Sequence, residues 1–240
     1  MLIAMATASN AAPKGFNYDE SRVPEFDLPD PLKNVTGAKS WPARRAEILT
    51  MLEDQMFGKA PAFDKESIKV TREIPDQDLL NGTAILSQPI LHLAGCEVQL
   101  MIVRPAVSAT SCPAFLAYNF RGNHTVHPDP AIALAKGWVP RTKNNKASEE
   151  HRGQSAKRWD ISRIIKNGYA LVTAYCGDVD PDFHDNFKNG VHANYGKPGP
   201  GDWGTIAAWA WGLSRILDHL ENEPAINASR IAGMGHSRLG

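Results

Sequence analysis

The chain has 240 residues, of which 42% are hydrophobic and 22% charged, an ordinary composition for a globular protein. Its 26 basic residues balance its 26 acidic residues, so no long-range field favours nucleic acid or an anionic membrane as a partner. No run of sequence approaches the roughly 18 apolar residues of a membrane-spanning helix. Three cysteines, odd in number and without CxxC spacing, give no disulfide framework and no zinc site.

Residues 1–28 are expected to form a leader and an extended arm. Residues 1–12 are mostly small and apolar, and Ala6-Thr7-Ala8 lies near a possible cleavage site. The stretch lacks a basic n-region and is short for a complete signal peptide. It is interpreted either as the remnant of a truncated signal peptide or as a disordered leader. Residues 29–240 are expected to form the domain proper.

A helix and an antiparallel section are expected first. Ser40 precedes Trp41 and Pro42, and a serine N-cap followed by proline in the first turn predicts the start of a helix, which Gly58 ends. The β-rich sequence after it predicts antiparallel strands with a hairpin turn at 94–96. These strands are expected at 68–74, 83–93 and 98–103.

The pattern changes at residue 114, where buried apolar strands begin to alternate with helices. The strands are expected at 114–118, 169–175 and 231–234, and the helices at 159–166 and 205–220. Alternation of this kind implies a parallel sheet with right-handed crossovers. The predicted fold class is therefore α/β. It has an antiparallel lead-in and then a parallel sheet flanked by helices, as in an α/β-hydrolase fold truncated after its nucleophile strand.

Two long loops, at 119–158 and 177–202, follow the first two of these parallel strands. Ligands bind at the carboxyl ends of the strands in open α/β sheets. Loops of this length in a compact domain are usually functional. We therefore expect both loops to border the functional site.

Residues 235–240 read Gly-His-Ser-Arg-Leu-Gly and directly follow the last predicted strand. A serine on a sharp strand-to-helix turn between glycines is the nucleophile elbow of α/β-hydrolases. Ser237 is therefore the candidate nucleophile, a role for which a hydroxyl needs a base and an oxyanion site. The second glycine stands three residues after Ser237 rather than two. The alternative interpretation is an ordinary turn with a serine N-cap.

Two stretches are candidates for the oxyanion site. The N–H of Arg238, the residue after the nucleophile, is a donor in this fold, and its guanidinium can add a charged donor. The alternative for Arg238 is a salt bridge to a loop carboxylate. The second stretch is the loop after the first parallel strand, where Gly122 and Asn123 can present N–H groups beside His124. The alternative there is that the glycine only makes a turn.

The eight histidines of the sequence all precede Ser237. In this fold the triad runs in the order Ser, Asp or Glu, then His, so none of them is expected to be the base. His236 is expected to pack. Four histidines lie in the two long loops, where they either contact substrate or are structural, the latter being the commoner case: His124, His127, His184 and His192.

Three aspartates alternate in Gly-Asp-Val-Asp-Pro-Asp at 177–182, which resembles the start of a calcium loop. Phe183 stands where an EF-hand needs glycine, and Asn189 stands where it needs glutamate. No metal site is predicted. Caps and loop hydrogen bonds are the expected roles of these aspartates.

The elbow resembles the Gly-x-Ser-Arg-x-Gly motif of glucuronoyl esterases, carbohydrate esterases that act on lignin–xylan ester links. Three further segments are similar to bacterial members, and the resemblance covers roughly residues 29–240. These segments are Asn-Phe-Arg-Gly-Asn-His at 119–124, Gly-Asp-Val-Asp-Pro-Asp at 177–182 and Ala-Trp-Ala-Trp-Gly-Leu-Ser-Arg at 208–215.

The resemblance implies hydrolysis of the ester between 4-O-methyl-glucuronic acid of xylan and a lignin alcohol. Ser237 attacks, Arg238 assists the oxyanion, no cofactor is needed, and the partner is the glucuronoxylan substrate. The family's next lysine falls just past Gly240, and its acid and histidine lie further on. The chain is therefore expected to be the N-terminal part of a longer protein, inactive alone, monomeric when full length, and secreted or periplasmic.

Two alternatives to this function stay open. One is an acetyl-xylan or other carbohydrate esterase on the same fold. The other is an inert chain, either a truncated reading frame or a pseudoenzyme.

Overall fold

The computed structural model describes residues 15–107 and 111–240. The chain divides into two compact units, one that ends at Ile48 and one from Leu49 to Gly240. In the first unit a short 3-10 turn, η1 (Glu20–Arg22), is capped by Asp19, whose carboxylate accepts from the N–H of Ser21. The boundary between the units falls inside a helix. The expected leader at residues 1–28 includes residues outside the described part and stays a prediction.

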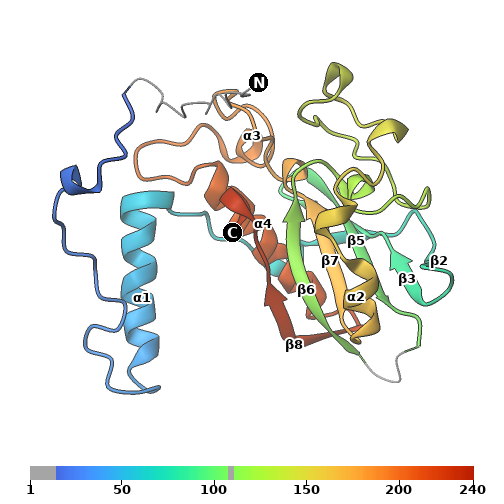
Figure 1. The fold of residues 1–240 in the computed structure, drawn as a ribbon, viewed down its shortest axis with the longest axis horizontal. Helices are drawn as coiled ribbons and strands as arrows, with labels where there is room; N and C mark the ends of the chain where they lie inside the picture. Colours follow the sequence, from blue (N-terminus) through green and yellow to red (C-terminus); the bar gives the residue numbers. More distant parts are fainter. Residues whose placement is uncertain (1–14, 108–110) are drawn as a thin grey trace, which may run out of the picture. The chain divides into compact units, whose positions relative to one another are not determined.

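That helix, α1, spans Trp41–Leu52 and begins where the sequence predicts (Figure 1). It continues as a π-helical turn, η2 (Glu53–Phe57), and ends at Gly58, whose φ is +76°. Ser40 does not cap the helix as the sequence predicted. The hydroxyl of Ser40 accepts hydrogen bonds from the N–H groups of Thr36 and Gly37, so it closes the turn before the helix.

The second unit is built on one eight-stranded sheet. Its order is β1-β4-β5-β7-β6-β8, with β2 joined to β3 and β3 to β5. The strands β1 to β5 pair antiparallel, whereas β6 pairs parallel with both β7 and β8, as predicted. The strands are β1 (Lys69–Thr71), β2 (Gln77–Leu79), β3 (Ala84–Ser87), β4 (Ile90–Leu93), β5 (Cys96–Pro105), β6 (Cys112–Asn119), β7 (Ala170–Tyr175) and β8 (Ile226–Gly233).

The predicted strand 83–93 is in fact two strands, β3 and β4. Pro89 has no N–H to donate to a ladder, and the chain breaks beside it. Both pieces still pair with β5, so the predicted antiparallel hairpin is retained. The buried side chain of Gln88 donates to the carbonyl of Ala131 at 2.9 Å and accepts from the N–H of Ala133 at 2.8 Å. Gln88, at the break between β3 and β4, thus connects the loop after β6 to the sheet through its side chain.

Two helices cover opposite faces of the sheet: α2 (Ile161–Lys166) and α4 (Thr205–Leu220), both close to their predicted bounds. Successive residues of β5 show this directly. Leu100 packs in the cluster that holds Trp209 of α4, and Met101 in the cluster that holds Ile161 of α2. Side chains of a strand alternate between faces, so β5 and β7 are buried on both. Figure 1 shows α2 and α4 on the two sides of β7.

The shorter helices are single turns in the loops. Those outside the arm are η3 (Lys65–Ser67), η4 (Asn123–Thr125), η5 (Lys143–Asn145), η6 (Glu149–His151), η7 (Ala156–Arg158), η8 (Cys176–Asp178), α3 (His192–Tyr195) and η9 (Ser237–Leu239). Among the described residues, no helix is both long and apolar enough to cross a membrane.

The parallel strands bring three loops to one edge of the sheet. β6 lies between β7 and β8, so the chain crosses from β6 to one neighbour and then to the other. Such a reversal in strand order is where open α/β sheets bind ligands. The loops that follow β6, β7 and β8 all leave this edge (Figure 1).

Candidate active site

Ser237 occupies the turn that directly follows β8. Its φ is +55°, a left-handed conformation that is uncommon for residues other than glycine and is often found at functional sites. It is the first residue of η9, and the N-cap position belongs to His236. Ser237 is therefore not the N-cap of this turn, and its role as nucleophile stays a prediction. The turn has the strained backbone that an exposed nucleophile requires.

The spacing of the elbow glycines has a direct physical cause. A Cβ added to Gly235 would lie 2.2 Å from the Cα of Gly240 and 2.3 Å from the carbonyl oxygen of Leu239. The backbone before Ser237 therefore touches the backbone three residues after it. This contact explains why glycine is needed at 235 although the second glycine is displaced from the usual spacing.

Arg238 lies between the loops that follow β6 and β7. Its guanidinium donates to the carboxylate of Asp182, and its central carbon is 5.0 Å from the ring centroid of Phe120. The ring of His236 is edge-on to the same Phe120, with the ring centroids 6.2 Å apart, but His236 is exposed, so the expected packing is limited to this one contact. The salt bridge is the alternative that the sequence left open for Arg238. It engages Nη2, and a guanidinium carries five N–H donors in all.

The loop after β6 is held by two asparagines. The side chain of Asn119 accepts from the N–H of Gly122 at 2.8 Å and donates to the side chain of Asn123 at 2.7 Å. Asn123 in turn donates to the carbonyl of Gln99 on β5 at 2.8 Å. Gly122 has φ +98°, so it does make a turn, and its N–H is occupied. In the described part of the chain the N–H of Asn123 donates no hydrogen bond.

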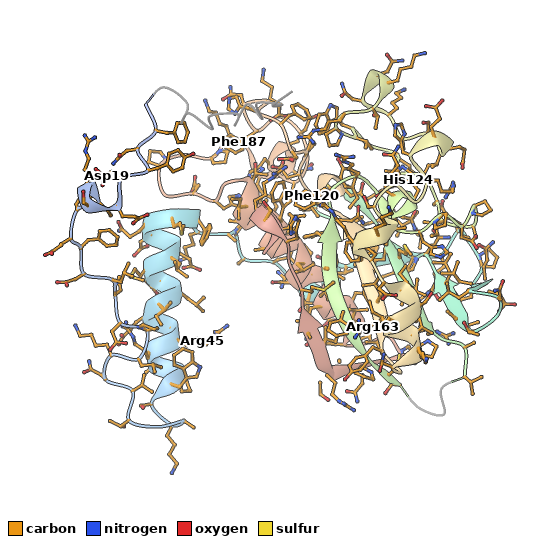
Figure 2. All side chains as sticks on the ribbon, in the orientation of Figure 1. Asp19, Arg45, Phe120, His124, Arg163 and Phe187 are labelled. Atoms are coloured by element: carbon orange, nitrogen blue, oxygen red, sulfur yellow. The ribbon has the colours of Figure 1, made fainter. Side chains whose placement is uncertain are left out.

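His124 is fully buried. Neither ring nitrogen has a hydrogen-bond partner among the described residues. Burial lowers the pKa of His124 to about 4, and the charge of Arg152 acts in the same direction. The ring is therefore neutral at physiological pH. Phe120 and His124, both labelled in Figure 2, come from the loop at the end of β6.

The three alternating aspartates take three different partners, as the loop interpretation predicted. Asp178 accepts from the N–H of Gln99 at 3.2 Å. Asp180 is buried and lies 3.2 Å from Nδ1 of His192. Asp182 pairs with Arg238. The loop after β7 is thereby joined to β5, to its own later turn and to the elbow.

The buried pair of Asp180 and His192 fixes this loop against α4. Nε2 of His192 is 3.3 Å from the carbonyl oxygen of Trp203, and the indole N–H of Trp209 donates to the carbonyl of Asp180 at 2.8 Å. His192 is therefore structural in the described chain. Asp182 comes two residues later than Asp180, so this anchoring also limits the positions from which Asp182 can reach Arg238.

No histidine ring hydrogen-bonds the hydroxyl of Ser237 in the part of the chain that the structure describes. The ring of His127 accepts from the N–H of Asp129 at 3.2 Å, and His184 is exposed. We still predict that none of the described histidines is the base, and no contact in the structure contradicts this prediction.

Sequence reasoning missed two residues of the site, Phe120 and Asp182. Both stand in segments that the sequence singled out, but only the fold shows that they meet Arg238. Asp182 is 56 residues away from Arg238 along the chain. A local pattern carries no signal for such a contact.

Known proteins are similar to this chain. A family model described as glucuronyl esterase, fungi, matches residues 159–240. Carbohydrate esterase MZ0003, from an unknown prokaryotic organism, is 43% identical over 251 residues, which are 96% of this chain and 57% of that protein.

Two solved structures resemble the chain over most of its length. One is a promiscuous CE15 esterase from the marine bacterial metagenome. It is 40% identical, with a TM-score of 0.77, and the match covers 94% of this chain and 60% of that one. The other is the glucuronoyl esterase from Solibacter usitatus, 36% identical, with a TM-score of 0.80, covering 92% and 60%.

The sheet order, its two covered faces and the strained serine after β8 define an α/β-hydrolase fold. The comparisons confirm the resemblance predicted from the sequence: the chain is a glucuronoyl esterase-like protein. It spans 57% of the length of the curated relative and 60% of each of the two solved chains. The activity and substrates of the whole protein are therefore matters for proposal.

Proposed function

We propose that the protein is a serine carboxylic-ester hydrolase that cleaves the ester between 4-O-methyl-glucuronic acid of xylan and lignin alcohols. The observation that carries the proposal is the conformation of Ser237, at φ +55° on the turn after β8, with Arg238 beside it. The glucuronoyl esterase among the structural relatives supports the substrate class.

In the proposed reaction the hydroxyl oxygen of Ser237 attacks the uronate carbonyl carbon and loses its proton to a base. The carbonyl oxygen becomes an oxyanion, which the N–H and guanidinium of Arg238 stabilise. In the described residues the N–H of Arg238 donates no hydrogen bond, which leaves it available. The alcohol leaves with a proton, and water then releases the acid from the serine ester. No cofactor takes part in these steps.

The base and acid of the triad are proposed to follow Ser237 in the chain, since that is their order in this fold. Residues 1–240 contain no histidine after Ser237. These residues alone are therefore proposed to be inactive. Gly122, Asn123 and His124 are proposed to border the site, with the N–H of Asn123 as the second oxyanion donor and His124 as support for the turn at Gly122.

The substrate also bears on the location of the protein. Polymeric xylan cannot enter a cell, so we place the enzyme outside the cytoplasm, secreted or periplasmic, with residues 1–28 as leader and arm. It is proposed to act as a monomer on glucuronoxylan. Nucleic acid and membrane are not proposed as partners, because the balanced charge gives no net electrostatic attraction to either.

The test is hydrolysis of a benzyl ester of glucuronic acid by the full-length protein and its Ser237→Ala variant. We expect turnover by the first and a loss of about three orders of magnitude or more in the second. Turnover that survives Ser237→Ala would show that the serine is not the nucleophile.

A second candidate, an acetyl-xylan or other carbohydrate esterase, is favoured by one observation: a structural relative is described as a promiscuous esterase. Acetylated xylan assayed beside the benzyl ester separates the two. Ser237-dependent release of acetate without cleavage of the glucuronate ester would select the second candidate. Failure on both substrates by the full-length protein would select the inert alternative.

A further inference from the structure

A cavity of about 480 Å³ opens near the carboxyl end of β7, and its lining residues lie between Ile90 and Gly190 in the chain. Its walls come from the start of β5, from the loop after β6 and from the loop after β7. β5 runs antiparallel to β7, so its first residues lie level with the carboxyl end of β7. Binding pockets for small ligands have volumes of this order.

One wall of the cavity is aromatic. The rings of Trp138 and Phe183 lie 4.7 Å apart between centroids, inclined at 48°. Both residues line the cavity, Phe183 is 39% exposed and Trp138 is partly exposed, so part of each side chain remains accessible. Exposed aromatic rings beside a cavity offer a flat apolar surface to one face of a ligand.

The remaining walls carry hydrogen-bonding groups, among them the side chains of Lys136, Glu97 and Asp178. Lys136 and Glu97 form an ion pair at 3.3 Å on the rim, so their charges compensate. Asp178 uses one carboxylate oxygen for the N–H of Gln99. Its other oxygen has no hydrogen bond within the described chain. Burial raises the pKa of Asp178 to about 7, so in mildly acidic solution the group is neutral and can donate as well as accept.

The cavity is joined to the elbow through three consecutive residues. Pro181 and Phe183 line the cavity, and Asp182 between them contacts Arg238. The segment that lines the cavity therefore also carries the carboxylate that contacts the elbow arginine.

We propose that this cavity is a subsite for a neutral pyranose unit of the polysaccharide chain that carries the reacting ester. The aromatic wall takes an apolar face of the sugar ring, and Asp178 and Asn189 take hydroxyl groups. The compensated ion pair on the rim selects against a charged sugar. The inference rests on the proposed function for its substrate class, but the sugar is bound outside the reacting centre.

The test is calorimetric titration of xylotriose into the full-length protein with Ser237→Ala, which prevents turnover. Trp138→Ala and Phe183→Ala are each expected to weaken binding about ten-fold, the effect of losing one aromatic contact in a small site. Trp138→Phe is expected to retain most of the affinity. Trp41→Ala, which removes a partly exposed tryptophan of α1 that does not line the cavity, is the matched control and should bind like the parent.

A second readout uses the active protein. The variants at 138 and 183 should lower kcat/KM for a glucuronoxylan ester about ten-fold and leave that for the benzyl glucuronate ester within about two-fold. Unchanged xylotriose affinity in both alanine variants would overturn the subsite. So would an equal loss on both esters, because it would indicate a contact with the leaving alcohol. Absence of any Ser237-dependent hydrolysis would instead overturn the proposed function, whereas the titration would still report on the cavity.

Discussion

The carboxylate of Asp182 contacts the guanidinium of Arg238 from a loop 56 residues earlier in the chain. The ring of Phe120 lies against the same guanidinium, whose central carbon is 5.0 Å from the ring centroid, so Arg238 is held from two sides. Asp182 is 24% and Arg238 47% exposed in its side chain, so a ligand could approach this pair.

The first prediction concerns Asp182. In Asp182→Asn the guanidinium loses its charged partner, and we expect kcat to fall about ten-fold with little change in KM, because the oxyanion forms only in the transition state. Steady-state kinetics on the benzyl glucuronate ester measures this. Asp218→Asn is the control, since Asp218 pairs with Arg215 at 2.6 Å on α4. An unchanged kcat would show that Asp182 does not position Arg238.

The second prediction concerns the glycine before the nucleophile. Gly235→Ala should abolish esterase activity, because its Cβ would lie 2.2 Å from the Cα of Gly240 and 2.3 Å from the carbonyl oxygen of Leu239, and relieving this collision would shift the turn that holds Ser237. Gly233→Ala is the matched control, since an added Cβ there meets nothing within 4 Å. Circular dichroism of both variants separates loss of the elbow from loss of the fold. Full activity in Gly235→Ala would contradict the described turn.

The third prediction is a loss of stability in acid. The pKa of His124 is about 4 in the folded state and 6.5 in an ordinary setting, so between these values the unfolded chain binds a proton that the folded chain does not. The contribution of neutral His124 to the free energy of unfolding is therefore fully present above pH 6.5. It falls as the pH is lowered toward 4, by up to roughly 3 kcal/mol.

Denaturant unfolding of wild type and His124→Leu at pH 7 and pH 5 measures this effect. The difference between the two pH values should be smaller in the variant. His184→Gln, at an exposed ring, should behave like wild type. An identical pH dependence in His124→Leu and wild type would show that the buried ring is protonated without cost.

The fourth prediction has the opposite sign. Burial raises the pKa of Asp178 from 3.8 to about 7, so the folded chain retains a proton that the unfolded chain has lost. The stability contributed by Asp178 is complete below pH 3.8 and is lost as the pH rises through 7. Asp178→Asn should therefore gain stability relative to wild type between pH 5 and pH 8. Glu66→Gln, at an exposed carboxylate, should show no such trend, and the same trend in both would refute the assignment.

The fifth prediction is that residues 1–240 alone hydrolyse no ester, since no histidine follows Ser237 in them. The measurement is turnover of the benzyl glucuronate ester by this chain and by the full-length protein at equal concentration. Ser237-dependent turnover by residues 1–240 would place the base among the histidines before the elbow.

Much of the fold was accessible from sequence because the relevant signals are local. The apolar run that became β7 and the amphipathic pattern that became α4 needed no distant information. Prediction failed where pairing decides the outcome. β2 is polar, and becomes a strand only through its pairing with β3. β8 begins at Ile226, five residues before its predicted start, because its first residue pairs with Cys112 across an irregularity in β6.

The candidate site was predictable only in part for the same reason. Ser237 is marked by its neighbours in sequence, and its positive φ agrees with the predicted turn. The occupied N–H of Gly122 depends on the side chain of Asn119, which folds back over the turn. No spacing in the sequence shows which of two plausible donors is already bonded.

The alternating aspartates make the loop after β7 sensitive to its length. Asp178, Asp180 and Asp182 reach β5, His192 and Arg238 respectively, and the residues between them have other neighbours. Insertion of one residue before Asp178 would bring Gly177 to the position that faces Gln99, and deletion of one residue would bring Val179 there. Either change would also break all three contacts together. Single substitutions here remove one contact each, so natural or engineered variation in this segment should proceed by replacement and not by changes in length.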